Sequence, residues 1–342
     1  MIPSGHRLGR CNRRAIAGRM ARFLLVACLF GLCAQPASAQ SAAPFPTRVV
    51  TLVVPFTAGS GSDILARMLG PLLAERWGRP VVVDNRAGAS GNIGADFVAK
   101  AAPDGHTLLM AINTMTMAAS LYRNLPFDPL ADFDPVGRLA IGGYILVAHP
   151  GVAATDLRSF VALAQAAPGR ANYASPGVGT PHHLAMELFK LRGAFDVVHV
   201  PYKGLAGAVT DLLGGQVQVM FASVHSVLPH VQAARLRPLA ITGEQRSALL
   251  PGLATFREQG FDYMDSIDSW YAVIAPARTP AALVARLNAD FSAVIGTATM
   301  REQLKGQGLV VATNTSEAMK SLLRDDLARW ARVVSEARIS AD

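Results

Sequence analysis

The sequence has no cysteine after residue 33 and no hydrophobic run long enough to cross a membrane. Its three cysteines, Cys11, Cys28 and Cys33, all lie among the first 39 of 342 residues. If those residues are removed after export, the remaining chain has neither disulfides nor thiol chemistry. Its stability must then come from a large hydrophobic core, and a chain of roughly 300 residues usually divides into two domains.

The first 39 residues have the three parts of a signal peptide. Six arginines form a basic region, residues 23–33 form an apolar run, and Ala37-Ser38-Ala39 is a cleavage site of small residues. The run is too short for a transmembrane helix. We expect the mature chain to begin near Gln40 and to be exported. Two alternatives stay open, namely lipid attachment at Cys28 and a twin-arginine signal at Arg13-Arg14.

The mature chain carries little net charge. The full sequence has a formal net charge of +8 at pH 7, and the six leader arginines, with no acidic residue beside them, supply six of these charges. About +2 therefore remains, and the basic balance of the whole sequence gives no case for a nucleic-acid partner.

Strand and helix patterns alternate along the mature chain. Apolar, β-branched runs predict strands at 49–54, 81–83, 107–112, 144–148, 197–200, 217–221, 238–241 and 270–275. Helical patterns lie at 64–77, 93–101, 157–166, 184–191, 206–213, 283–295 and 316–337. This alternation is typical of an α/β fold with mostly parallel sheets covered on both faces.

Two breaks in composition predict the domain organisation. His149-Pro150-Gly151 and the residues 276–280 each follow a predicted strand. We expect domain 1 to comprise residues 40–146 and 272–342, and domain 2 to comprise residues 147–271. Two strands that cross between domains would form a hinge, and the cleft between the domains would then be the ligand site.

Two glycine turns lie between predicted strands and helices. The first is Gly59-Ser60-Gly61, where Ser60 or Ser62 can cap a helix that begins near Asp63. The second follows Asn172, and there Thr180 is expected to cap a helix whose first residue is Pro181, a strong helix start before His182. Unpaired N–H groups at such helix starts bind anions, so both turns predict a carboxylate site. The alternative is that both are tight turns without a ligand.

Other chemistries find little support in the motifs. The dinucleotide pattern G-x-G-x-x-G fails at Ile64, and no G-x-S-x-G motif is present. His183 and Glu187 have a metal-ligand spacing but no third ligand nearby. We expect no metal, no cofactor and no catalysis, and an exported hydrolase that uses Asp63 or His182 is the rival hypothesis.

A series of ordered motifs resembles the Bug family of periplasmic solute-binding proteins, the receptors of tripartite tricarboxylate transporters. The matching segments are 54–59 (VPFTAG), 84–94 (DNRAGASGNIG), 103–105 (PDG), 173–182 (YASPGVGTPH), 200–204 (VPYKG), 211–217 (DLLGGQV) and 270–271 (WY). Together they extend over essentially all of the mature chain.

The resemblance implies two α/β domains of the type II binding-protein kind, with a small carboxylate bound between them. Carried onto this chain, its ligand contacts are Phe56, Thr57, Ala58, Ser60, Gly61 and Ser62 on one side and Gly179, Thr180, His182 and Lys203 on the other. From their places at a helix start and a strand end, Asp63, Asn113 and Thr114 are added as candidates. Many relatives have glycine at position 60, so the resemblance does not fix which acidic amino acid, aromatic acid, dicarboxylate or tricarboxylate binds.

The resemblance also implies a cellular setting. It predicts a monomeric protein in the periplasm that delivers its ligand to membrane transporter subunits. A receptor that presents its ligand to a sensor kinase is the other hypothesis, and the sequence does not separate the two.

Overall fold

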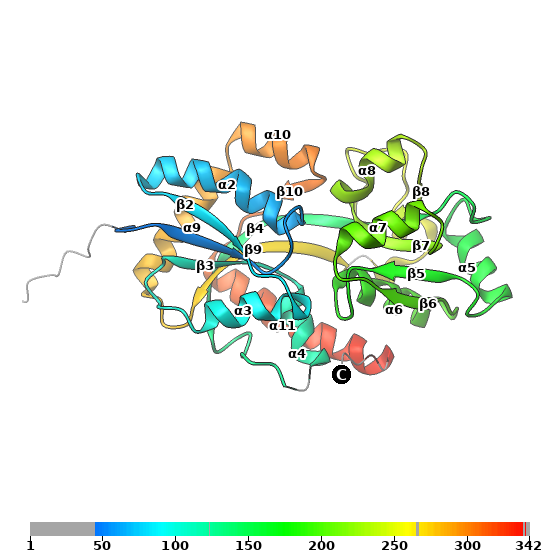
Figure 1. The fold of residues 1–342 in the computed structure, drawn as a ribbon, viewed down its shortest axis with the longest axis horizontal. Helices are drawn as coiled ribbons and strands as arrows, with labels where there is room; N and C mark the ends of the chain where they lie inside the picture. The colour runs from blue at the N-terminus through cyan, green and yellow to red at the C-terminus, as the bar shows by residue number, and fades with distance from the viewer. Residues whose placement is uncertain (1–44, 123, 265–266, 338, 340–342) are drawn as a thin grey trace, which may run out of the picture. The chain divides into compact units, whose positions relative to one another are not determined.

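A single twisted sheet organises the protein in the computed structural model, which describes residues 45–122, 124–264, 267–337 and 339 (Figure 1). The strand order is β2-β1-β3-β9-β4-β7-β5-β6, and β8 and β10 also pair with β4. The strands are β1 (Val50–Val54), β2 (Val81–Asn85), β3 (Thr107–Ile112), β4 (Phe133–Ala148), β5 (Asn172–Ser175), β6 (Val198–Pro201), β7 (Val219–Ser223), β8 (Arg237–Ile241), β9 (Asp268–Pro276) and β10 (Leu309–Val311). Residues from Phe45 onward form one compact unit.

The 16-residue strand β4 belongs to two parts of this sheet. Its residues 133–143 pair with β9, whereas residues 144–148 pair with β7 and β8. We call the part with β1, β2, β3 and β9 the first half and the part with β5, β6, β7 and β8 the second half. The expected crossing of two strands between domains is compatible with this layout, and the domain limits given above stay a prediction.

Helices cover both faces of each half, as continuous apolar strands require. In the first half, α2 (Gly61–Trp77), α9 (Ala281–Ile295) and α10 (Ala298–Gly306) pack on one face, and α3 (Asn92–Ala99), α4 (Thr114–Leu121) and α11 (Ser316–Ala337) pack on the other. In the second half, α5 (Leu157–Ala166) and α6 (Pro181–Gly193) cover one face, and α7 (Leu205–Leu213) and α8 (Val224–Gln232) cover the other.

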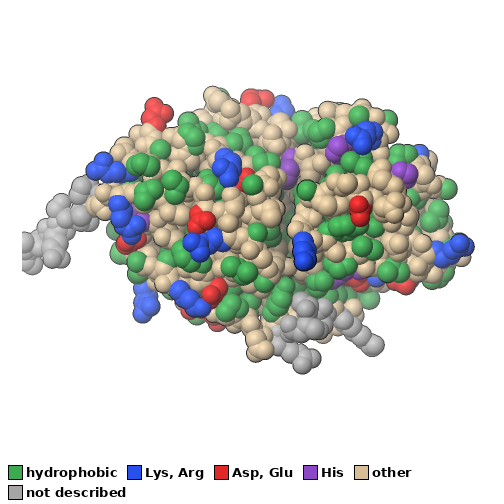
Figure 2. Space-filling model, in the orientation of Figure 1, with side chains coloured by type: hydrophobic (Ala, Val, Ile, Leu, Met, Phe, Trp, Pro, Cys, Tyr) green, Lys and Arg blue, Asp and Glu red, His purple; other side chains and the backbone are tan. Residues whose placement is uncertain are grey.

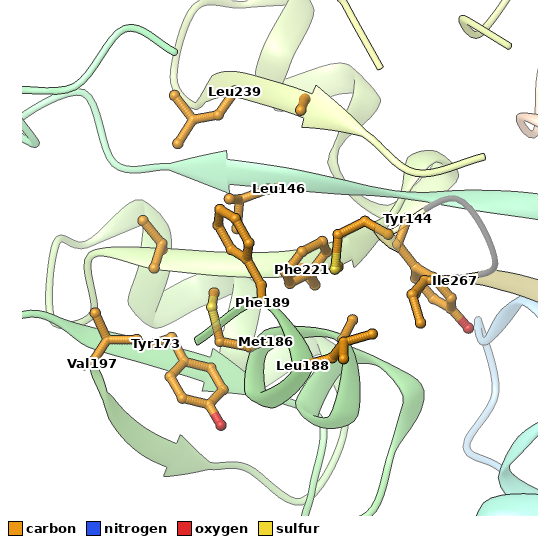
Figure 3. Packing of buried hydrophobic residues seen from close by; sticks show 14 of the residues in the cluster. Tyr144, Leu146, Tyr173, Met186, Leu188, Phe189, Val197, Phe221, Leu239 and Ile267 are labelled. Carbon is orange, nitrogen blue, oxygen red and sulfur yellow. The ribbon is translucent and has the colours of Figure 1, made fainter. Parts of the chain in front are cut away.

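The core of the second half is built from large side chains. Tyr173, Phe189 and Phe221 are fully buried, and Figure 3 shows them packed with Leu146 and Met186 between the sheet and α6. Trp330 and Val334 of α11 join this cluster, whereas Met319 and Leu323 of the same helix belong to the core of the first half. The C-terminal helix therefore packs against both halves.

Local signals explain several helix ends. Ser60 caps α2 by accepting from the N–H of Asp63, and Gly78 ends the helix in the left-handed conformation. The prediction that Ser60 or Ser62 caps this helix is confirmed for Ser60. None of the helices in the described part of the chain is both long enough and apolar enough to cross a membrane.

The expected α/β class is confirmed, but the expectation of mostly parallel sheets was wrong. Five of the nine strand pairings in the described chain are antiparallel. The reason lies in β4 and β9, because the chain leaves the first half along β4 and returns along β9. Among the described strands, parallel ladders join β1 with β2 and β3, and β5 with β6 and β7. The predicted leader, with Cys28 and the cleavage site, lies outside the described residues.

Candidate functional site

A cavity of about 920 Å³ lies between the two halves of the sheet. Four loops form most of its wall, and they follow β1, β2, β5 and β6. Their lining residues are Phe56, Thr57, Ala58, Gly59 and Ser60, then Ala87, Gly88, Ala89, Ser90 and Gly91, then Pro176, Gly177 and Thr180, and then Tyr202, Lys203 and Gly204. Figure 2 shows the surface hollowed between the part that carries α2 and α3 and the part that carries α7. We call this hollow the ligand cavity.

The position of the ligand cavity follows from the strand directions. The strands β1 and β2 run parallel, and so do β5 and β6. Each of the four loops thus leaves the carboxyl end of a parallel strand and leads into a helix. Ligands in open α/β sheets bind at such ends, where helix N-termini present free N–H groups.

The wall of the ligand cavity is largely apolar and carries the cationic side chain of Lys203 at its edge. Apolar side chains of Phe56, Leu205, Val209 and Leu213 form much of it. Lys203 is exposed, and no ion pair joins it to another described residue. No Asp, Glu or Arg is among the lining residues. The cavity therefore suits an anion with an apolar body.

Two further polar groups line the same wall. The Tyr202 hydroxyl donates to Asp211 Oδ2 at 2.7 Å. Burial, together with the hydrogen bond and the charge of Asp211, raises the pKa of Tyr202 to about 12, so it stays neutral. His230 of α8 lies on this wall as well.

The first glycine loop is braced by a buried carboxylate. Asp63 is 2% exposed and accepts from Gly59 N–H at 2.9 Å, from Asn85 Nδ2 at 2.9 Å and from Arg67 Nε at 3.0 Å. Burial alone would raise the pKa of this carboxyl, but the hydrogen bonds from Arg67, Gly59 and Asn85 outweigh it and lower the pKa. Asp63 therefore supports the loop from behind and does not line the cavity.

The second glycine loop is braced by neutral groups. Gly179 N–H donates to His183 Nδ1 at 3.1 Å, and the Thr180 hydroxyl donates to the Gly177 carbonyl at 2.8 Å. Burial, with the nearby Lys190 charge, lowers the pKa of His183 to about 4. The imidazole is therefore neutral near pH 7, and its Nδ1 accepts. Thr180 is the N-cap of α6 by position, but its hydroxyl makes no capping bond, which differs from the expected cap.

A second imidazole supports the same loop. His199 stacks on His183 with ring centroids 4.0 Å apart, and its Nε2 lies 2.6 Å from the Ser175 hydroxyl. Burial, followed by the repulsion that a protonated His183 would exert, lowers the pKa of His199 to about 3. Ser175 in turn accepts from Gly177 N–H at 3.2 Å. The loop thus lies on two stacked, uncharged histidines.

The predicted site residues divide into two groups. Phe56, Thr57, Ala58, Ser60, Thr180 and Lys203 line the ligand cavity. Gly61, Ser62, Asp63, Asn113, Thr114, Gly179 and His182 do not line it. All but Gly61 of these seven are buried.

Behind the cavity lies an inner polar cluster, formed by Asn113, Tyr144, His182, Ser223 and His225. The rings of Tyr144 and His182 are 4.9 Å apart, and His182 Nε2 lies 3.4 Å from the Ser223 hydroxyl. Burial, followed by the repulsion that a protonated His225 would exert, lowers the pKa of His182 to about 3. Asn113 Oδ1, His182 Nδ1 and His225 Nε2 are buried without a partner among the described residues. Such atoms are normally satisfied by water or by a ligand.

Gly61 connects the cluster to the first glycine loop. A Cβ at Gly61 would collide with the Tyr271 hydroxyl and lie 3.1 Å from His225 Cε1. Only glycine fits this approach between the start of α2 and the inner polar cluster.

Sequence reasoning missed the loop after β2 and most of the loop after β6 as parts of the site. Both loops were in the motifs that carry the family resemblance, at 84–94 and 200–204. A structural signal was also present in the sequence, because Gly91 and Gly204 each lie two positions before a predicted helix start, at 93 and at 206. Of these residues, only Lys203 was a candidate.

The described residues contain no group of three His, Cys, Asp or Glu side chains that could hold a metal ion. His183 and Glu187, which have a metal-ligand spacing, are engaged elsewhere. His183 accepts from Gly179, and Glu187 accepts from Tyr173 and Lys190.

Comparisons with known proteins agree with this architecture. The chain is 36% identical over 320 residues to Protein BugT of Bordetella pertussis, covering 93% of this chain and 98% of that one. Two solved structures from Rhodopseudomonas palustris are similar throughout. Rpa4515 with adipate has a TM-score of 0.82 at 34% identity, covering 86% of this chain and 99% of that one. MatC with bound malate has a TM-score of 0.78 at 30% identity, covering 85% and 100%.

A family model settles the affiliation. The model of the tripartite tricarboxylate transporter family receptor, TctC, matches residues 65–339, which is most of the chain. That match runs through both halves of the sheet and the loops after β2, β5 and β6. The chain belongs to the TctC family of tripartite tricarboxylate transporter receptors.

Proposed function

We propose that this receptor captures a small carboxylate in the ligand cavity and delivers it to the membrane subunits of a tripartite tricarboxylate transporter. The observation that carries the proposal is the charge of the cavity wall. Four loops at the carboxyl ends of parallel strands surround it, Lys203 at its edge has no ion pair with another described residue, and no Asp or Glu is among its lining residues. An anion is the ligand that this wall favours.

The groups proposed to hold the carboxylate come from both halves. The first half offers the hydroxyls of Thr57 and Ser60, which line the cavity before the start of α2. The second half offers Lys203 and the N-terminus of α7. Each charge-assisted hydrogen bond contributes roughly 1.5–3 kcal/mol. Four to six such bonds, less the cost of closing the cleft, are compatible with micromolar affinity.

We propose a deeper role for the inner polar cluster. Its unpartnered atoms on Asn113 and His182 would take up water or a polar group of the ligand once the cleft closes. In this role Asn113, Thr114 and His182, which were predicted as ligand contacts, would form the inner wall of the site. Gly179 and Asp63 would act by holding their loops in place.

The proposal includes no catalysis. The lining residues offer no activated nucleophile, and His182, His183 and His199 are neutral and either engaged or enclosed. We propose a monomeric receptor that works in the periplasm after removal of its leader. The alternative partner is a sensor kinase, and the ligand cavity would serve both roles equally.

Two relatives suggest which ligands to test first. Rpa4515 was solved with adipate and MatC with malate, and both molecules are dicarboxylates. Adipate has the longer apolar body, which suits the wall formed by Leu205, Val209 and Leu213. We propose dicarboxylates with an apolar body as the preferred class.

Calorimetric titration with adipate, malate and the monoamide of each tests the proposal. We expect the monoamide of the acid that binds to be weaker by at least about a hundredfold, on the order of 2.7 kcal/mol, because amidation removes charge-assisted bonds. Lys203→Gln should weaken the acid about tenfold and the monoamide less. Lys320→Gln on exposed α11 is the control and should bind as the wild type does. An amide that binds as tightly as its acid would contradict the anion site.

A further inference from the structure

We propose that Ser90 is a latch across the ligand cavity and a positioning residue that sets the lifetime of the closed state. This inference rests on the proposed function only in placing the ligand in this cavity. Ser90 lies in a short 3-10 helix, Ala89–Gly91, after β2 in the first half. Its hydroxyl donates to the Val178 carbonyl at 2.7 Å. Val178 lies in the glycine loop after β5, in the second half.

The bond joins two segments that are 88 positions apart in the sequence. Both Ser90 and the neighbouring Gly177 line the ligand cavity, so the bond stands at its rim. Within the described chain, no other side-chain hydrogen bond links the loops after β1 and β2 to the loops after β5 and β6. Opening of the cavity at this rim must therefore break it.

A third residue, Tyr122, orients the Ser90 side chain. The carbonyl of Val178 can only accept a hydrogen bond, so the Ser90 hydroxyl uses its single proton to donate to this carbonyl. The Tyr122 hydroxyl, 3.4 Å away, must then be the donor to Ser90 Oγ. Tyr122 follows α4 in the first half, and this bond holds the Ser90 side chain toward the cavity.

The backbone at Ser90 adds a second observation. Ser90 has φ 54° and ψ 29°, the left-handed region that glycine adopts freely and other residues adopt at a cost. Gly88, Ala89 and Gly91 beside it also have positive φ. A glycine at position 90 would fit this backbone without strain but would carry no hydroxyl. Serine therefore provides the latch at the expense of local strain.

Because of this strain, two substitutions can be compared that differ in backbone strain but both remove the hydrogen bond to Val178. Ser90→Ala removes the hydroxyl and keeps the strain, whereas Ser90→Gly removes both. If Ser90 acts as a latch, both variants release ligand faster, although Ser90→Gly folds at least as stably as the wild type. A purely structural role would instead make the two variants diverge in ligand release.

The kinetic arm uses adipate and malate as probes, with stopped-flow measurement of association and dissociation. Both variants should raise the dissociation rate about five- to tenfold, the effect of one lost hydrogen bond, and leave the association rate unchanged. The factor should be the same for each acid that binds, because the latch touches protein and not ligand. Tyr122→Phe should give a smaller increase, and Ser321→Ala on exposed α11 should give none.

The second arm needs no ligand and separates failure of the latch from failure of the proposed function. Amide hydrogen exchange in the segment 177–180 should be faster in both Ser90 variants than in the wild type. Unchanged exchange in both variants would overturn the latch, whether or not any carboxylate binds. A dissociation factor that differs between adipate and malate would also overturn it, because Ser90 would then contact the ligand directly.

Discussion

The two glycine loops of the first and second halves have equivalent positions but are held by different chemistry. Each loop follows a parallel strand and leads into a helix, α2 in the first half and α6 in the second. The loop before α2 is tied to the ionised Asp63, which also binds Arg67. The loop before α6 is tied to the neutral His183, which lies on His199. The same backbone geometry thus depends on a charge in one half and on the absence of charge in the other.

The difference teaches that equivalent places in the sheet do not imply equivalent responses to solution conditions. A carboxylate that accepts from several donors holds its loop in place as long as the carboxylate stays ionised. A buried imidazole holds its loop in place only while its Nδ1 carries no proton and can accept the hydrogen bond from the loop. The first brace should fail when its charge is removed by mutation, and the second should weaken when the pH falls.

The largest expected effect comes from removing the charge in the first loop. Asp63→Asn keeps the size of the side chain but places an amide N–H₂ against donors from Gly59 or Asn85. We expect a loss of about 3 kcal/mol in the free energy of unfolding, since breaking a buried, charge-paired group leaves its partners unsatisfied. Urea denaturation at pH 7.5 measures it.

A matched control uses an ion pair on the surface. Arg192 and Glu336 are 51% and 41% exposed in their side chains and form a pair at 2.7 Å. Glu336→Gln should change the free energy of unfolding by less than about 0.5 kcal/mol, as exposed pairs do. Equal effects in the two variants would mean that Asp63 is no brace.

The second expected effect is a pH dependence of the free energy of unfolding that comes from the second loop and not from the first. His183 has a pKa of about 4 in the folded protein and about 6.5 when unfolded, so between these values unfolding takes up a proton. The free energy of unfolding therefore falls as the pH is lowered from 6.5 and stops falling for this group below about 4. The contribution of His183 is about 0.8 kcal/mol at pH 6. The charges that face the two imidazoles are those of Lys190 and Glu187.

His183→Asn makes this prediction specific, because the amide oxygen can accept from Gly179 N–H and does not titrate. The wild type should lose about 0.8 kcal/mol more than this variant between pH 7.5 and pH 6 in urea denaturation. Asp63 does not contribute in this window, since its lowered pKa makes its stabilisation fail only below the ordinary value of 3.8. Equal losses in both proteins would show that His183 is not the titrating brace.

The comparison of the loops also shows where sequence reasoning succeeds. Strand β3 and helices α5 and α11 have the predicted limits. Their patterns are strong, with a continuous apolar run in β3 and an amphipathic period in the helices. The start of β4 was missed because Pro135, Arg138 and Gly142 interrupt its apolar pattern. Helix α8 was missed since Pro229 and two histidines lie within it.

The candidate site was predicted in part for a similar reason. Local signals place Ser60 and Thr180 near strand ends, the family resemblance adds Lys203, and these three residues do line the cavity. The role of Asp63 had a local signal too, because Arg67 follows at the i, i+4 spacing of a helical ion pair. The bond between Ser90 and Val178 has no such signal. Long-range contacts depend on how the halves pack, which no short pattern encodes.

The smallest expected effect concerns Thr180. The sequence predicts that its hydroxyl caps α6, whereas in the structure the hydroxyl makes a different hydrogen bond. A side-chain cap would contribute about 1 kcal/mol to α6, but the Thr180 hydroxyl donates to the Gly177 carbonyl instead. That carbonyl also accepts from the Ser175 hydroxyl at 3.0 Å and from Thr180 N–H at 3.3 Å. Thr180→Ala therefore leaves it satisfied, and we expect a loss of only about 0.5 kcal/mol in the free energy of unfolding. Thr180→Ser keeps the hydroxyl and should restore the wild-type value. A loss of 1 kcal/mol or more in Thr180→Ala would mean that the hydroxyl caps the helix after all, and the second loop would then depend on its helix start as the first loop does on Ser60.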